Sequence, residues 1–124
     1  MTYTPNHFAC WFEIPVTDLE ASKSFYAEVF DMSLTIVDGG PNPLVMFPVS
    51  DEAGGVSGHL YPGTPSENGP PIHLVVPDNL EAARTRVKAA GGKVESENIE
   101  LPSGLFFYAR DLDGNSIGLF EFNS

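Results

Sequence analysis

The sequence matches itself when it is shifted by 61 positions, and this repeat limits the possible folds more than any other feature. Residues 18–23 (DLEASK) align with residues 79–84 (NLEAAR), and residues 44–47 (LVMF) align with residues 105–108 (LFFY) without a gap. A third match at the same offset lies near the end of each unit. Matches spread in this way indicate a duplicated structural unit. Because a unit of about 60 residues buries little apolar surface alone, we expect the two units to form one domain over residues 1–124.

Hydrophobic periodicity gives the first unit, residues 7–61, the order strand, helix and three strands. Residues 8–16 alternate in a way that is typical of a half-buried strand. From Leu19 to Phe30, apolar side chains recur every three or four residues, as in a helix that packs on a sheet. The three following strands are expected at residues 33–38, 44–49 and 55–61.

The second unit, residues 71–122, repeats this order. Residues 62–70 precede it and contain three prolines and two glycines, so we expect them to link the two units. The elements of the second unit are expected at 71–76 (strand), 79–90 (helix), 93–98, 104–110 and 116–122 (strands). The sequence therefore predicts an α+β fold made of two βαβββ repeats.

Charge and composition exclude several classes of function. Seventeen acidic and six basic residues give a formal charge of −11, which disfavours binding to the phosphates of nucleic acids. No apolar run reaches the roughly 18 residues needed to cross a bilayer, and the first residues do not resemble a signal peptide. Cys10 is the only cysteine, and its apolar neighbours predict a buried thiol. We expect a cytoplasmic protein with neither nucleic-acid nor membrane partners.

Several local runs resemble those of the glyoxalase/bleomycin-resistance/dioxygenase (vicinal oxygen chelate) superfamily, in particular a bacterial glyoxalase-like subgroup of unassigned chemistry. They are residues 12–20 (FEIPVTDLE), 89–94 (AAGGKV) and 113–119 (DGNSIGL), and the resemblance covers about residues 7–122. The resemblance implies a curled mixed sheet around a half-open cavity, helices on its outer face, and a homodimer. Such motifs specify the fold and leave the chemistry open.

Enzymes of this superfamily hold a divalent ion with histidine and glutamate side chains from the first and last strand of each repeat. The corresponding positions in this sequence are Trp11, Ser57, Ile72 and Gly118. None of these four residues is a competent ligand for a divalent ion, so we expect neither a metal ligand nor a cofactor. A shift of one residue in the second repeat would turn His73 inward, where it could join His59 and Glu13. A divalent metal at those three residues therefore stays open.

The resemblance also gives the cavity an aromatic lining with a few polar groups. The ligand-binding residues expected there are Trp11, Ser57, Tyr61, Ile72 and Phe120. Aromatic side chains bind flat or amphipathic organic molecules by stacking and burial. The sequence therefore predicts a protein that binds a small organic molecule without the superfamily's metal.

Two catalytic alternatives stay open, so the sequence does not decide whether the protein is an enzyme. One is a metal-dependent lyase or dioxygenase of the glyoxalase type, which would require the shifted register. The other is a metal-free isomerase that uses Glu13 and His59 as catalytic acid and base. In a purely structural role, Glu13 would pair with Arg110 or across the dimer.

Overall fold

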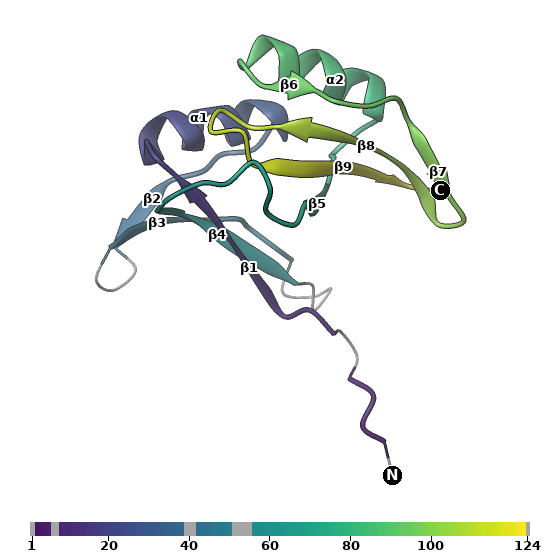
Figure 1. Ribbon diagram of the computed structural model, residues 1–124, viewed down its shortest axis with the longest axis horizontal. Helices are drawn as coiled ribbons and strands as arrows, with labels where there is room; N and C mark the ends of the chain where they lie inside the picture. The colour runs from purple at the N-terminus through teal and green to yellow at the C-terminus, as the bar shows by residue number, and fades with distance from the viewer. Residues whose placement is uncertain (1, 6–7, 39–41, 51–55, 124) are drawn as a thin grey trace.

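The chain forms two halves with the same order of elements, as the computed structural model shows for residues 2–5, 8–38, 42–50 and 56–123 (Figure 1). The first half contains β1 (Trp11–Val16), α1 (Leu19–Val29), β2 (Ile36–Asp38), β3 (Pro43–Met46) and β4 (Ser57–Pro62). The second half contains β5 (Ile72–Val75), α2 (Leu80–Ala89), β6 (Lys93–Val94), β7 (Ile99–Leu101), β8 (Gly104–Arg110) and β9 (Ser116–Phe122). The predicted α+β fold of two βαβββ-like repeats is confirmed.

Each half builds its own mixed sheet. The strand orders are β1-β4-β3-β2 and β5-β9-β8-β6, and β7 also pairs with β8. The first strand of each half runs parallel to the last strand of that half, and the other pairs are antiparallel. No strand pair joins the two sheets within the described part of the chain. β1 and β5 are therefore edge strands of the two sheets.

The two helices begin at equivalent positions of the repeat. The side chain of Asp18 accepts a hydrogen bond from the backbone N–H of Ala21 at 3.0 Å, and Asn79 accepts one from Ala82 at 2.9 Å. Both caps satisfy a backbone donor that the first helical turn leaves free. After α2, Gly91 has a positive φ of 96°, a conformation that glycine adopts without steric cost.

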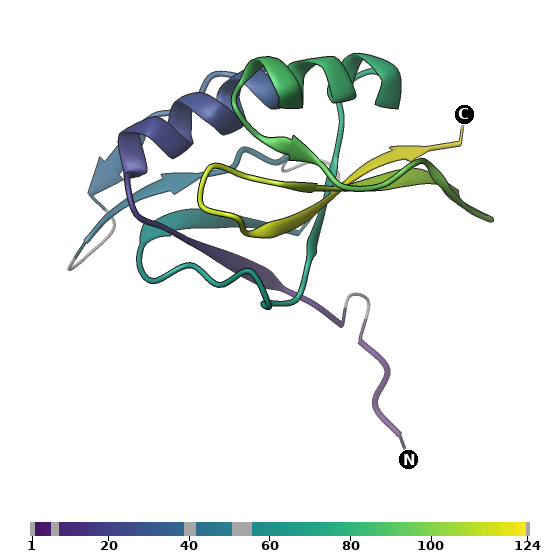
Figure 2. The same ribbon diagram turned by 45° about the horizontal axis from the view of Figure 1, so that its top comes forward.

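Both helices lie on the same side of the two sheets and contact each other (Figures 1 and 2). The core lies between the helices and the sheets. Its most deeply buried side chains include Val16, Tyr26, Val29, Val45, Leu60, Val87, Phe107, Ile117 and Leu119. The Arg86 guanidinium of α2 also donates to the carbonyl oxygen of Val29, at the end of α1, at 2.7 Å. Helix ends and core together join the two halves.

The strand expected at residues 93–98 is interrupted, and this is the main difference from the predicted elements. Only its first two residues form a strand, β6, and β7 begins at Ile99, just beyond the expected range. The two short strands pair with opposite ends of β8. Between them, the Ser96 hydroxyl oxygen accepts a hydrogen bond from the backbone N–H of Tyr108 at 2.9 Å. A side chain thus replaces the backbone acceptor that a continuous strand would supply. The first residue of the strand expected at 55–61 lies outside the described residues.

The loop between β8 and β9 fastens the second half to the first. The Asp111 carboxylate is buried there and accepts a hydrogen bond from the phenol of Tyr26 in α1 at 2.7 Å. The side-chain amide of Asn115 donates to Asp111 at 3.0 Å and to the carbonyl oxygen of Pro15 in β1 at 2.7 Å. We call these four residues the inter-half clasp. Its buried polar atoms are satisfied by one another, which makes their arrangement specific.

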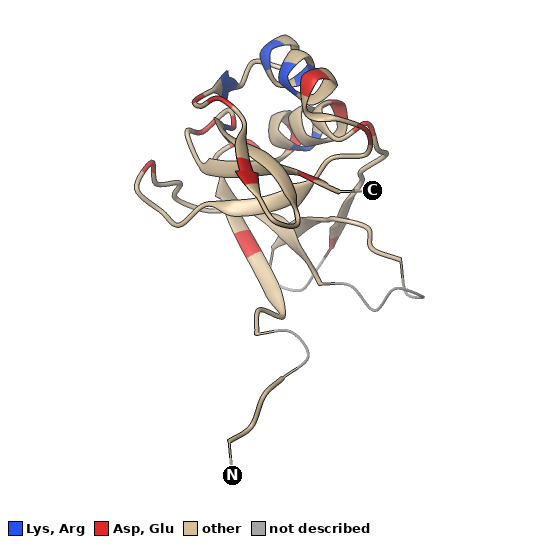
Figure 3. Cartoon of the chain, turned by 90° about the vertical axis from the view of Figure 1, so that its right-hand side faces the viewer, with Lys and Arg blue, Asp and Glu red and all other residues tan. Residues whose placement is uncertain are grey.

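The distribution of charge differs between the two sheets (Figure 3). The six basic residues are Lys23, Arg84, Arg86, Lys88, Lys93 and Arg110. All of them lie in the two helices or in β6 and β8, so the strands of the first sheet have none. Within the described residues, no helix has the length and apolar character needed to cross a membrane. The prediction for Cys10 was wrong, because its side chain is exposed just before β1 begins.

Candidate functional site

Three side chains lie next to one another on the face of the first sheet that points away from the helices. Trp11 and Glu13 alternate along β1, and the parallel register places His59 of β4 opposite Glu13. The indole N–H of Trp11 donates to Nδ1 of His59 at 2.9 Å, and Nε2 of His59 lies 3.2 Å from Oε1 of Glu13. Because Nδ1 is an acceptor in this arrangement, the imidazole proton belongs on Nε2, where it faces the carboxylate.

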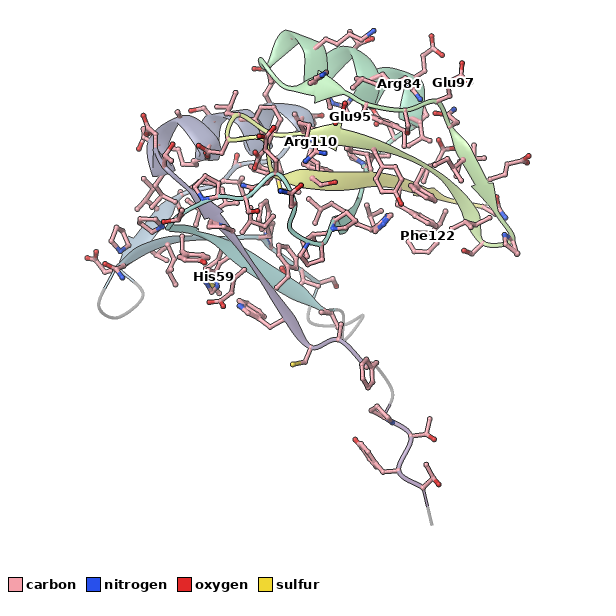
Figure 4. The ribbon with its side chains drawn as sticks, in the orientation of Figure 1. His59, Arg84, Glu95, Glu97, Arg110 and Phe122 are labelled. Carbon is pink, nitrogen blue, oxygen red and sulfur yellow. The ribbon has the colours of Figure 1, made fainter. Side chains whose placement is uncertain are left out.

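The side chains of His59 and Glu13 differ in their exposure to solvent. The side chain of His59, which is labelled in Figure 4, is only 12% exposed, whereas that of Glu13 is 62% exposed, so Glu13 faces solvent. Tyr61 meets the His59 ring edge-on, with a centroid distance of 6.0 Å. The expected pairing of Glu13 with Arg110 does not occur within the chain, because Arg110 donates to Glu95 at 2.7 Å.

Ser57 lies at the start of β4, and its hydroxyl is already engaged. It is buried and donates to the carbonyl oxygen of Phe47 at 2.7 Å. This bond holds the segment after β3 against β4. The hydroxyl is therefore a structural group at the bottom of the site rather than a free donor for a ligand.

In β5, His73 rather than Ile72 points away from the helices. Ile72 packs against the core, and His73 lies opposite Gly118 of β9. A Cβ atom at position 118 would collide with the His73 ring, which occupies the space that a side chain there would need. Of the two registers that the sequence left open, the structure has the one that turns His73, and not Ile72, to this face. A one-residue change in the repeat offset reverses the faces of a strand, and the 61-residue offset does not hold here.

Five rings cover the same face of the second sheet. They belong to His73, Phe106, Tyr108, Phe120 and Phe122. The rings of His73 and Phe106 are 4.9 Å apart, and the nearly parallel rings of Phe106 and Phe120 are 6.1 Å apart. Burial lowers the pKa of His73, which favours the neutral, aromatic imidazole. Figure 4 shows Phe122 at the open end of this face, where it is 60% exposed.

Of these rings, only Phe120 was predicted as a site residue. Phe106 and Tyr108 alternate along the strand expected at 104–110, so period-two alternation could have placed them on the face of Phe120. Phe122 follows Phe120 by two residues and could have been found in the same way. His73 required the correct register of β5.

A cleft of about 550 Å³ lies between the first sheet, the end of α1 and β5. Its lining is mainly apolar and includes Trp11, Phe12, Phe47, Ile72, Leu74 and Val75. Ser57 and His73 are the polar side chains in its wall. Three predicted ligand-binding residues, Trp11, Ser57 and Ile72, thus line one cleft. Tyr61 and Phe120 lie outside it, on the exposed faces of the two sheets.

The side chains present do not fit the divalent ion that enzymes of the superfamily hold. Within the described ranges, no group of three or more His, Cys, Asp or Glu residues is arranged to hold a metal ion. His59 and Glu13 are together, but His73 belongs to the other sheet and does not join them. Gly118 contributes no side chain, and the Trp11 indole is a donor only.

Residues 4–119 match the sequence model of the Glyoxalase/Bleomycin resistance protein/Dioxygenase superfamily, and the chain belongs to this superfamily. No curated protein matches the sequence. A similar solved structure is the hypothetical protein SA1046 from S. aureus, with a TM-score of 0.67 and 25% identity over 94% of this chain and 99% of that chain.

Two other solved structures show that this fold serves different functions. TnmS3, an antibiotic binding protein from Streptomyces sp. CB03234, has a TM-score of 0.66 and 23% identity over 98% of this chain and 100% of its own. Lactoylglutathione lyase from Agrobacterium tumefaciens has a TM-score of 0.62 and 22% identity over 95% of each chain. At these identities the comparison establishes the fold alone.

Proposed function

We propose that the protein binds a flat, mainly apolar organic molecule in the cleft between its two sheets, and that binding needs no metal. The observation that supports this most strongly is the cleft itself. Its volume of about 550 Å³ falls within the range of roughly 300–1,000 Å³ that is typical of small-molecule sites. Its mainly apolar lining, to which Trp11 and His73 also belong, suits burial of an aromatic compound.

TnmS3 supports the class of ligand that we propose. It is an antibiotic binding protein with the same fold, and an antibiotic small enough for such a site is an organic molecule, as is the ligand that we propose. The catalytic alternatives have less support. Nδ1 of His59 accepts a hydrogen bond from the Trp11 indole and Nε2 lies 3.2 Å from Glu13, so both ring nitrogens already have partners within the chain.

We also propose that two copies of the chain associate through the sheet faces that point away from the helices. Large apolar side chains are exposed there, including Trp11 (45%), Val75 (57%) and Phe122 (60%). Exposed apolar groups of this size on adjacent strands favour a protein partner. A homodimer in the cytoplasm, without nucleic-acid or membrane partners, is the assembly that we infer.

Filling the cleft is expected to weaken binding. We expect Val75→Phe to lower the affinity for N-phenyl-1-naphthylamine, a neutral fluorescent aromatic probe, by at least about ten-fold, which corresponds to roughly 1.4 kcal/mol. Val75 lines the cleft and is exposed, so the larger ring takes up ligand volume without disturbing the core. Probe fluorescence measured against protein concentration gives the affinity.

Leu112→Phe is the matched control. Leu112 is 44% exposed in the loop between β8 and β9 and does not line the cleft. This variant is expected to bind the probe as the original protein does. Equal affinities for all three proteins would show that the probe binds elsewhere, and absence of binding to the original protein would contradict the proposed function.

A further inference from the structure

We propose that the outer face of the first sheet, which points away from the helices, binds an organic cation with a quaternary ammonium group. The residues that carry this proposal are Trp11 and Glu13 of β1 and His59 and Tyr61 of β4. The inference goes beyond the proposed function, because the ligand is charged and lies on an exposed sheet face, whereas the cleft takes a mainly apolar molecule.

Three rings lie side by side on this face, with His59 in the middle. Its centroid is 5.8 Å from that of the Trp11 ring and 6.0 Å from that of the Tyr61 ring. The hydrogen bond from the indole N–H to Nδ1 of His59, at 2.9 Å, holds the Trp11 ring in place before a ligand arrives. Trp11 is also 45% exposed, so a ligand can reach it. The faces of aromatic rings attract cations, and tryptophan attracts them most strongly.

Glu13 gives this face a negative charge. Its side chain is 62% exposed, and Oε1 lies 3.2 Å from Nε2 of His59. Among the residues that the structure describes, no lysine or arginine forms an ion pair with Glu13. The strands of the first sheet contain neither type of residue, and Met46, which lies opposite His59 in β3, is uncharged. A cationic ligand therefore supplies a counter-ion that this sheet does not.

The combination of rings and one carboxylate favours an organic cation over a metal ion. A divalent ion needs several nitrogen or oxygen ligands that converge on one point. Here Glu13 is a single carboxylate, and Nδ1 of His59 already accepts from the Trp11 indole. A quaternary ammonium group donates no hydrogen bond, so ring faces and one nearby carboxylate are sufficient to hold it. The net charge of −11 also raises the concentration of cations near the protein.

Choline and its uncharged analogue, the alcohol in which carbon replaces the choline nitrogen, test the role of charge because their shapes are nearly the same. Saturation-transfer NMR titrations measure both affinities at low salt. The protein is kept dilute, since the association of two copies through this face would cover Trp11. We expect choline to bind at least about five-fold more tightly than the alcohol. Equal affinities, or no binding of choline, would overturn the proposal.

Substitutions of Trp11 locate the cation. Trp11→Leu removes the ring and should weaken choline binding at least about three-fold, whereas Trp11→Phe keeps a ring face and should retain most of the affinity. Phe122→Leu is the control, because Phe122 is an exposed ring of the second sheet, and it should bind choline as the original protein does. Circular dichroism checks that each variant is folded. Equal affinities for Trp11→Leu and the original protein would contradict a site at this ring.

Glu13→Gln separates a local contact from the attraction of the whole acidic protein. It keeps the shape of the side chain but removes its charge, and it should weaken choline binding at least about two-fold at low salt. Glu97→Gln removes the same charge from an exposed residue of the second half, which Figure 4 shows near α2 and away from His59. This control should have no effect. Equal losses in the two variants would show that the net charge alone attracts choline, and the site on the first sheet would be ruled out.

Val75→Phe distinguishes the cation site from the cleft. This variant fills the cleft, so it should weaken binding of N-phenyl-1-naphthylamine and leave that of choline unchanged. Loss of choline binding in Val75→Phe would overturn a separate cation site. Absence of N-phenyl-1-naphthylamine binding, with choline bound as expected, would contradict the proposed function and leave the cation site supported.

Discussion

Asp111→Ala is expected to lower the free energy of unfolding by roughly 3–5 kcal/mol, because several buried donors lose their acceptor at once. The Asp111 carboxylate accepts hydrogen bonds from the Tyr26 phenol, from the Asn115 amide and from the backbone N–H groups of Asp113 and Asn115. Their distances lie between 2.7 and 3.0 Å, and the carboxylate is only 5% exposed. Alanine leaves the Tyr26 phenol and the backbone N–H of Asn115 buried without this acceptor, while the Asn115 amide keeps its bond to Pro15.

Urea denaturation followed by circular dichroism measures this loss. The inter-half clasp holds both halves, so we also expect a single transition, as for one domain over residues 1–124. Asp113→Ala is the control in the same loop. Asp113 accepts a hydrogen bond from the Thr17 hydroxyl at 2.6 Å in an exposed position, and its loss should cost about 1 kcal/mol or less. Equal losses for the two variants would show that the clasp does not stabilise the fold as described.

Stability is expected to fall above about pH 10 through Tyr26. Burial raises the pKa of Tyr26 well above its usual value, and the nearby Asp111 carboxylate raises it further. The phenol therefore stays protonated in the folded chain while it ionises in the unfolded chain near pH 10. Its contribution is complete below that pH and is lost above it, at up to about 1.4 kcal/mol per pH unit.

Comparison with Tyr26→Phe isolates this effect from the other titrating groups. The variant should be less stable than the original protein at pH 8, since it lacks the hydrogen bond to Asp111. Above pH 10 it should lose stability more slowly, so urea denaturation at pH 8 to 11.5 should show the difference narrowing. A constant difference over this range would contradict a buried phenol that resists ionisation.

The internal repeat carried most of the information about the fold. It predicted the order of elements in both halves, and Asp18 and Asn79 begin the helices at equivalent positions. The end of β6 at Val94, short of the expected end at residue 98, could not be predicted, because it depends on the contact of the Ser96 hydroxyl with Tyr108, which is 12 residues away. Nothing in the local pattern of that segment distinguishes a strand from an interrupted strand.

The candidate site was harder to predict from the sequence than the fold. Alternation placed Glu13 and His59 on one face, and the structure brings them within 3.2 Å of each other. It gave no sign of the bond from Trp11 to His59, which depends on side-chain conformation across two strands. The 61-residue offset does not hold in β5. It assigned Ile72 to the face of the strand that His73 occupies in the structure, because a shift of one residue exchanges the two faces.

The most direct test of the proposed function is the affinity for N-phenyl-1-naphthylamine before and after the protein is stripped of divalent ions with a chelator. The cleft has an apolar lining and the described residues offer no set of metal ligands, so we expect the same affinity in both states. Loss of binding on chelation, with recovery when manganese, nickel or zinc is added back, would contradict a metal-free binding site and favour the lyase or dioxygenase alternative.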